Sequence, residues 1–504
     1  MTPITWDGAA LTGTLELVCD VVVVGSGPAG AAVARTLAFA GAKVVVLEEG
    51  PSVDTATLPP DAYGSMARTY REGGASLMLG KAPIPYVQGR VVGGTSVVNG
   101  AISWRLPKDV WDTWVAADPS LHDALPWEVL DAVHAEIERD LGIAPTPPEL
   151  AGNNNALLAK GAEVMGLAHR PIARNVLGCE GLARCLNGCT RGHKQSMERT
   201  YLPDAAAAGA RIACNVRVDA VLHADGRASG VVATASGGGS VFVRASVAVV
   251  LAASAIQTPA LLLASGIRHG PVGRHLTCHP GLSVVARFPE SVKMWHGATQ
   301  GHEVIGLRGE GLKFEALGLD RALLGARLAG TGAKWAENIA TSDRCTSWGV
   351  AAKAKGEGRV RRGPFGTIVT WSPTPSDVAL FRRGLAVLCE LAVAAGAEHA
   401  WPGVYGFDET VADVASARRL AELGSLDPRA YTALATHLFG TCRMGSQAAD
   451  AVVRPDFRHH TVAQLYVADS SVFPTNTGVN PQTSILALAT LCARNVEGVA
   501  AGSR

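Results

Sequence analysis

The stretch Asp20-Val-Val-Val-Val-Gly25-Ser-Gly27-Pro-Ala-Gly30-Ala-Ala-Val-Ala-Arg35 decides the fold, and Lys43-Val-Val-Val-Leu-Glu48 completes it. The four valines predict a buried parallel strand, and the small residues after the glycines predict a helix. A second apolar run ends in an acid, Glu48. The segment therefore predicts a βαβ unit with the G-x-G-x-x-G spacing of a dinucleotide-binding fold.

Each part of this unit has a physical role. Gly25 permits the tight turn, Gly27 lets the backbone approach a pyrophosphate, and Gly30 lets helix and strand pack closely. Glu48 is placed to accept hydrogen bonds from a ribose hydroxyl. These residues alone leave open whether the dinucleotide is FAD or NAD.

The chain has 504 residues, which predicts two or three domains or sub-domains. Its 45 basic and 44 acidic residues nearly cancel, so the charge balance gives no reason to expect a nucleic-acid partner. The N-terminus lacks the basic and apolar regions of a secretory signal, and no run of eighteen apolar residues predicts a membrane span. We expect a cytoplasmic protein.

Three further groups of motifs follow along the chain. Gly89–Gly100 is rich in glycine and small polar residues, which suggests backbone pressed against a ligand. Ser246–Ser254 predicts a buried strand followed by a helix that ends at Gly266. Near the C-terminus lie His437–Gly445, Tyr466–Pro474 and Asn480–Thr483.

These motifs, in this order and spacing, resemble the glucose–methanol–choline (GMC) flavoprotein oxidoreductases along most of the chain. Gly89–Trp104 resembles the family loop that covers the flavin, and Ala252–Ile267 resembles the second family signature. The resemblance implies FAD in place of NAD. Some members attach FAD covalently through a histidine in the glycine loop. Val98 stands at that position here, which implies non-covalent FAD.

The fingerprint and the resemblance together predict the cofactor site. For Val218, backbone contact with adenine and an ordinary strand valine are both open, and for Asp469 a flavin contact and a helix N-cap are both open. The predicted cofactor-binding residues are Gly25, Gly27, Gly30, Glu48, Arg90, Gly94, Thr95, Asn99, Val218, Asp469 and Thr483.

The predicted fold class is α/β, with a Rossmann-like FAD-binding domain that is discontinuous in sequence and an α+β substrate domain built on an antiparallel sheet. The FAD-binding domain is expected at 14–110, at 175–275 and at 431–504. A helical, substrate-side segment is expected at 111–174, and the substrate-binding domain at 276–430. Within that domain, Gly311–Leu328 is interpreted as a helix, more simply a core-packing helix than a lid or a helix that leans on a membrane surface.

Oxidation of an alcohol needs a base for the hydroxyl proton and an acceptor for the hydride. By resemblance, His437 is the catalytic base and Asn480 the second active-site residue. Asn480 cannot act as a base, but it can hydrogen-bond the substrate oxygen. The alternatives are a structural histidine and a turn residue before Pro481. His279 is interpreted as structural, and His459 as a surface residue.

Three cysteines, Cys179, Cys185 and Cys189, form a C-x5-C-x3-C segment. It resembles a segment of bacterial FAD-dependent sugar dehydrogenases that holds a [3Fe–4S] cluster, and long-chain alcohol oxidases carry a similar one. The open alternatives are thiols without metal, a disulfide plus one free thiol, or zinc with His193.

The predicted function is FAD-dependent oxidation of a small-molecule alcohol to a carbonyl, with hydride passing to the flavin. The electrons would leave for oxygen or for an external acceptor, such as an acceptor protein or a quinone. The alternative is a hydroxynitrile lyase of the same family, which keeps FAD without net redox chemistry. The substrate is not predicted from the sequence.

Overall fold

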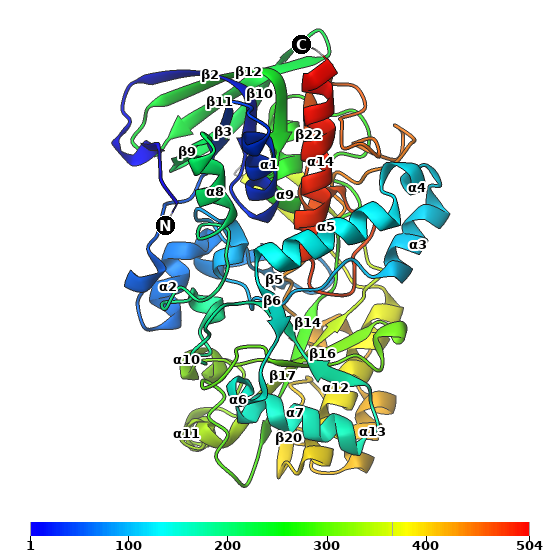
Figure 1. Cartoon of the computed structure of the whole chain (residues 1–504). Helices are drawn as coiled ribbons and strands as arrows, with labels where there is room; N and C mark the ends of the chain where they lie inside the picture. The colour runs from blue at the N-terminus through cyan, green and yellow to red at the C-terminus, as the bar shows by residue number, and fades with distance from the viewer. Residues whose placement is uncertain (1, 365, 503–504) are drawn as a thin grey trace.

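The computed structural model describes residues 2–364 and 366–502. Two β-sheets form the upper and lower halves of the molecule in Figure 1, and the N- and C-terminal segments both lie in the upper half. The upper half contains the dinucleotide fingerprint, and the lower half contains most of the middle of the chain.

The upper sheet has the order β1-β9-β3-β2-β12-β11-β10. The predicted βαβ unit is confirmed as β2 (Thr14–Val24), α1 (Pro28–Phe39) and β3 (Val44–Leu47). Strands β2 and β3 pair in parallel, and the buried face of α1 packs small residues against the sheet. Helix α14 (Gln482–Gly502) packs beside α1, so the C-terminal helix covers the same face (Figure 1).

Strand β12 (Ser240–Leu251) joins two parts of this sheet. Its first half pairs antiparallel with β11 (Arg227–Ala235), and its second half pairs in parallel with β22 (Leu465–Val467). Residues 212–221 have a strand-like pattern in the sequence, but the strand is interrupted at Asn215, where φ is +55°. The segment forms β9 (Arg211–Cys214) and β10 (Val216–Ala224), which lie at different places in the sheet.

The lower sheet is antiparallel, with the order β20-β14-β17-β16-β15-β7. Helix α12 (Pro375–Ala395) packs across its face, and a capping box formed by Thr374 and Asp377 starts the helix. Strand β7 (His169–Pro171) and α7 (Asn153–Val164), both from the predicted helical segment 111–174, belong to this half. In contrast, α5 (Trp127–Asp140) of the same segment packs against α14.

The interpretation of Gly311–Leu328 as one helix is wrong. Its first part is β16 (Leu312–Ala316), and its central part is the short helix α10 (Arg321–Gly325). Both elements lie in the lower half of the molecule (Figure 1). The alternation of Leu312, Lys313, Phe314 and Glu315 has the period of a strand. Leu312 and Phe314 pack under α12, whereas Lys313 and Glu315 face the opposite side of the sheet.

The other strands are β1 (Trp6–Asp7), β4 (Ser76–Met78), β5 (Ile84–Tyr86), β6 (Ile143–Pro145), β8 (Ala173–Asn175), β13 (Thr277–Cys278), β14 (Gly281–Arg287), β15 (His302–Val304), β17 (Cys345–Ala352), β18 (Gly358–Gly363), β19 (Gly366–Trp371), β20 (His399–Trp401) and β21 (Leu438–Phe439). The other α-helices are α2 (Ala62–Thr69), α3 (Lys108–Ala117), α4 (Ser120–Ala124), α6 (Pro148–Ala151), α8 (Tyr201–Ala207), α9 (Ser254–Ala264), α11 (Gly332–Ala340) and α13 (Val414–Leu423). Within the described part of the chain, no helix is long and apolar enough to cross a membrane.

Candidate active site

A cavity of about 1050 Å³ extends between the two halves of the molecule. Its walls include the glycine loop after β2, the Gly89–Gly100 loop, strand β10 and the start of α14. Residues of the lower sheet close the opposite side. The cavity therefore connects the predicted dinucleotide site with the predicted catalytic residues.

The glycine loop has the geometry that the fingerprint predicts. Gly25 has φ +98°, and a Cβ on Gly30 would lie 1.9 Å from the Gly25 oxygen, so helix and loop could not pack with a larger residue there. A Cβ on Gly94 would lie 2.7 Å from the Gly27 Cα. The two predicted cofactor loops thus touch each other through glycine backbones at the cavity wall.

Glu48 lies in this wall and is 7% exposed. Its carboxylate accepts hydrogen bonds from the Ser26 amide at 3.0 Å, the Ser26 hydroxyl at 2.6 Å and the Gly50 amide at 2.8 Å. Burial raises its pKa, and these donors oppose that effect. Glu48 therefore fixes the glycine loop as well as facing the cavity.

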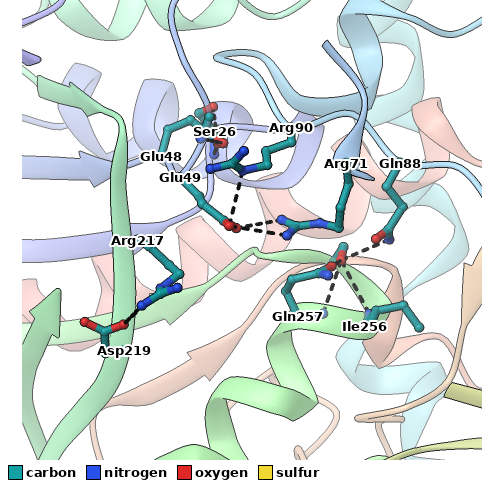
Figure 2. Close-up of polar contacts among 12 residues, drawn as sticks. Ser26, Glu48, Glu49, Arg71, Gln88, Arg90, Arg217, Asp219, Ile256 and Gln257 are labelled. Atoms are coloured by element: carbon teal, nitrogen blue, oxygen red, sulfur yellow. Dashed lines mark hydrogen bonds and ion pairs between the residues drawn. The ribbon is translucent and has the colours of Figure 1, made fainter. Parts of the chain in front are cut away.

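A charged group beside Glu48 was not anticipated from the sequence. Arg71 donates to Glu49 at 2.6 Å, and Arg90 lies 3.2 Å from the same carboxylate (Figure 2). Glu49 and Arg71 line the cavity, whereas the predicted Arg90 does not. The Nε of Arg71 is buried without a hydrogen-bond partner in the described structure. A ligand oxygen is the natural partner for such a donor.

The remaining predicted cofactor residues divide into two groups. Thr95, Asn99, Val218 and Asp469 line the cavity, with Val218 beside the Arg217–Asp219 pair on β10 (Figure 2). Thr483 does not line it. Its hydroxyl is buried in the first turn of α14 and has no hydrogen-bond partner among the described residues.

Asp469 serves as a helix N-cap, one of the two roles considered for it. Its carboxylate accepts from the Ser471 amide at 2.9 Å at the start of a short 3₁₀ turn. It also accepts from the Ser254 amide at 2.9 Å and the Thr258 hydroxyl at 2.5 Å. Burial raises its pKa. Asp469 therefore joins the C-terminal segment to the start of α9.

His437 lies on the far side of the cavity, next to His279. Strand β21 pairs antiparallel with β13, with Phe439 opposite Thr277 and Leu438 opposite Cys278, and this register places the next two residues opposite each other. His279 Nε2 lies 2.6 Å from His437 Nδ1. The structure thus gives His279 a direct contact with the predicted base.

Both histidines are held neutral. Burial and the nearby Lys313 ammonium lower the pKa of His437 to about 3. Burial and the neighbouring His437 also hold the pKa of His279 well below its ordinary value. One edge of His437 opens on the cavity. A neutral imidazole at this position can accept a proton.

Asn480 lines the same cavity just before α14. Its Oδ1 accepts a hydrogen bond from Lys313 Nζ at 3.0 Å. Lys313 is fully buried and lies 2.8 Å from Glu303, and it also pairs with Glu315. The two carboxylates therefore raise the pKa of the Lys313 ammonium despite its burial. Sequence analysis did not single out these three residues.

The two carboxylates are further held by neutral and charged donors. Trp104 donates to Glu303 at 2.9 Å, and Arg170 donates to it at 2.8 Å. Gln300 donates to Glu315 at 2.6 Å. Since each buried charge has a partner, the network fixes the lysine and, through it, the amide of Asn480.

The interpretation of His459 as a surface residue is wrong. It is 3% exposed, and its Nδ1 accepts hydrogen bonds from the Thr461 and Val462 amides. Burial lowers its pKa to about 4. His459 is a structural histidine that closes a turn.

The three cysteines border a cavity of about 20 Å³ together with His193 and Glu180. A space of this size holds about one water molecule. Within the described residues, no three His, Cys, Asp or Glu side chains are grouped to hold a metal ion. The geometry therefore does not fit the predicted [3Fe–4S] cluster, and His193 instead pairs with Glu180 at 2.9 Å. The seven other cysteines are buried, as predicted.

Comparison with known proteins identifies the family. Models of the GMC oxidoreductase family match residues 66–281 and 355–489, and a model of an FAD-binding domain matches residues 20–58. An uncharacterized GMC-type oxidoreductase of Mycobacterium tuberculosis is 36% identical over 93% of this chain and 74% of its own length. A long-chain-alcohol oxidase of Arabidopsis thaliana is 28% identical over 96% of this chain and 69% of its own.

Among solved structures, the crystal structure of a pyridoxine 4-oxidase has a TM-score of 0.71 at 18% identity and covers 94% of this chain and 98% of its own. This likeness concerns the fold. The cavity walls fit FAD, which the matched FAD-binding model implies, because glycine backbones form the loop and Arg71 offers an unpaired donor. The chain therefore belongs to the GMC oxidoreductase family and is an FAD-binding flavoprotein.

Proposed function

We propose that this protein oxidises an alcohol to a carbonyl compound, with His437 as the base and Asn480 as the group that orients the substrate oxygen. The observation that carries the proposal is that both side chains line one cavity with the glycine loop and Glu48. FAD, when bound, supplies the hydride acceptor. The residues proposed to hold it are Gly25, Gly27, Gly30, Glu48, Gly94, Thr95, Asn99, Val218 and Asp469, whereas Arg90 and Thr483, also predicted from the sequence, do not line the cavity.

The contact with His279 determines how His437 can act. To accept the hydroxyl proton at Nε2, His437 must carry its own proton at Nδ1. That Nδ1–H group then donates a hydrogen bond to His279 Nε2. The 2.6 Å separation between these two atoms supports that arrangement. His279 is then a positioning residue that selects the active tautomer.

Lys313 determines how Asn480 can act. The Lys313 ammonium donates a hydrogen bond to the amide oxygen of Asn480, so the amide nitrogen is the group available to the cavity. A nitrogen donor suits the oxygen of an alcohol that is losing its proton, because negative charge grows on that oxygen. Lys313 strengthens this effect through its own charge.

The test uses the purified holoenzyme under anaerobic conditions. Addition of a substrate alcohol should bleach the flavin absorbance, and His437→Gln should slow bleaching by about 100-fold or more while flavin content stays the same. Equal rates in the wild type and His437→Gln would contradict the role of His437. Repeating the assay with oxygen and with artificial acceptors separates an oxidase from a dehydrogenase.

The [3Fe–4S] cluster is a separate prediction from the sequence, and no step above depends on it. The three thiols would have to rearrange to hold a cluster, because among the described residues no three His, Cys, Asp or Glu side chains are grouped to hold a metal ion. Analysis of iron and acid-labile sulfide in protein purified without oxygen tests it. Protein that carries stoichiometric flavin but no iron would refute it.

A further inference from the structure

The substrate side of the cavity has an unusual composition. Gly281 and Ser283 of β14 lie on the same sheet face as Gly349 and Ala351 of β17, with Ser283 opposite Gly349. These small side chains leave space above the sheet. Leu282, Leu317, Leu319 and Leu323 add apolar lining around this space, while the polar Gln300 and Glu315 lie on the same wall, with Glu315 opposite Gly349.

Of the arginines that line the cavity, Arg71 and Arg217 pair with carboxylates on the cofactor side, Arg362 stands on β18, and Arg327 lies on the same segment as Leu323. Arg327, which follows α10, lines the cavity, and its Nη1 donates to the Ser283 hydroxyl. Within the described residues, no carboxylate lies within 4.0 Å of its guanidinium. Burial lowers its pKa, and no neighbouring charge offsets that effect. Among the described residues its other two nitrogens have no hydrogen-bond partner, and the side chain is partly accessible.

Apart from the exposed Glu72, the carboxylates that line the cavity are engaged elsewhere. Glu315 pairs with Lys313 and accepts from Gln300. The others belong to the cofactor side, where Glu49 pairs with Arg71 and Asp219 pairs with Arg217. An arginine in apolar surroundings without an acidic partner is costly unless a ligand supplies the anion.

We propose that Arg327 binds a carboxylate carried by the alcohol substrate, at the end remote from the reacting hydroxyl. This inference rests on the proposed alcohol oxidation and names its substrate class. A single carboxylate neutralises a single guanidinium, whereas a phosphate dianion would leave one charge uncompensated in apolar surroundings. The carboxylate anchors the substrate and is unchanged by the reaction.

The spacing of residues along the chain limits the distance between the reacting hydroxyl at His437 and the carboxylate at Arg327. His279, which contacts His437, precedes Ser283 by four residues, so their Cα atoms are at most about 14 Å apart. A 2-hydroxy acid cannot place its hydroxyl at His437 and its carboxylate at Arg327 at the same time, because its carboxylate is attached to the reacting carbon. The substrate class is therefore an ω-hydroxy fatty acid or a similar apolar alcohol with a distal carboxylate.

The first experiment compares ω-hydroxy fatty acids with primary alkanols of the same chain length in anaerobic flavin reduction. The wild type should prefer the hydroxy acid in kcat/KM, with an optimum at one chain length. Arg327→Met should lower that preference by about 10- to 100-fold, as expected for the loss of a charged hydrogen bond. Equal preference in the wild type and the variant would overturn the proposal.

Arg321→Met is the matched control. Arg321 lies six residues earlier on the same segment, is exposed, and stacks on Trp295 at 4.6 Å outside the cavity. Its loss removes the same charge and should leave the preference unchanged. If both arginine variants lose the preference for hydroxy acids equally, the preference comes from the overall positive charge of this region, and Arg327 does not bind the carboxylate.

A binding experiment separates this inference from the proposed function. Fatty alkanoates have the carboxylate but no hydroxyl, so they should bind to the wild-type holoenzyme without reducing it and perturb its flavin spectrum. Arg327→Met should weaken this binding by about 10-fold or more. Failure of every alcohol to bleach the flavin would refute the proposed function alone, whereas equal alkanoate binding by both proteins would refute the role of Arg327.

Discussion

Lys313 Nζ lies 3.0 Å from Asn480 Oδ1, and this contact links the substrate-side sheet to the start of the C-terminal helix. The lysine stands on β16 and the asparagine just before α14, so two segments separated by 167 residues meet at the candidate active site. The amide orientation of Asn480 thus depends on a buried ion network in the other half of the molecule.

Lys313→Met is expected to destabilise the protein by about 3–5 kcal/mol, because it leaves Glu303 and Glu315 buried without their cation. Urea unfolding of the holoenzyme measures the change. Lys334→Met is the control, since Lys334 pairs with Glu409 at the surface and its loss should cost less than about 1 kcal/mol. Similar losses in the two variants would contradict the proposed importance of the network.

His279→Phe is expected to lower kcat for flavin reduction by about 10-fold or more, because His437 loses the acceptor that fixes its tautomer. His279→Gln keeps a polar group of similar reach and should recover part of the rate. KM should change little in either variant, because His279 acts through His437. A large rise in KM with kcat unchanged would show that His279 contacts the substrate instead.

Gly94→Ala is expected to reduce FAD content, because its Cβ would lie 2.7 Å from the Gly27 Cα and push the two cofactor loops apart. The measurement is the ratio of flavin to protein after purification. Gly41→Ala is the matched control, since Gly41 also has a positive φ, of +80°, but open space around it. Full flavin content in Gly94→Ala would contradict the close approach of the loops.

Stability should fall as pH is lowered from about 6.5 toward 4. Burial lowers the pKa of His134 and of His459 to about 4, below the ordinary histidine value. The unfolded chain therefore binds more protons in this window, and each histidine contributes up to about 1.4 kcal/mol per pH unit. The raised pKa values of Glu48 and Asp469 act in the opposite sense.

His459→Asn isolates one of these contributions. The asparagine oxygen can accept the Thr461 and Val462 amides in place of the histidine Nδ1, but it does not titrate. The melting temperature of the variant should therefore depend less on pH between 6.5 and 4 than that of the wild type. If the melting temperatures of the variant and the wild type changed with pH in the same way, His459 would not titrate between pH 6.5 and 4.

Local patterns in the sequence were sufficient for the upper half of the molecule. The βαβ unit follows from the valine runs and glycine spacing, and Gly25, Gly27 and Glu48 lie at the cavity as the fingerprint predicts. These features are determined within about thirty residues of chain, where turn geometry and strand period decide the outcome. The interruption at Asn215 escaped prediction, because one residue with positive φ divides an otherwise continuous strand pattern.

Other features depend on contacts between distant segments. The alternation of Lys313 and Glu315 was interpreted as part of a helix, and even a correct strand assignment would have placed these charges in solvent. His279 meets His437 only through the pairing of β13 with β21, and Arg327 gains its position from β14. The sequence by itself determined the cofactor fold, and its resemblance to a known family pointed to His437 and Asn480 as the predicted catalytic residues. Tertiary structure decided which charges are buried and what they face, because burial and pairing depend on the packing of segments up to 167 residues apart.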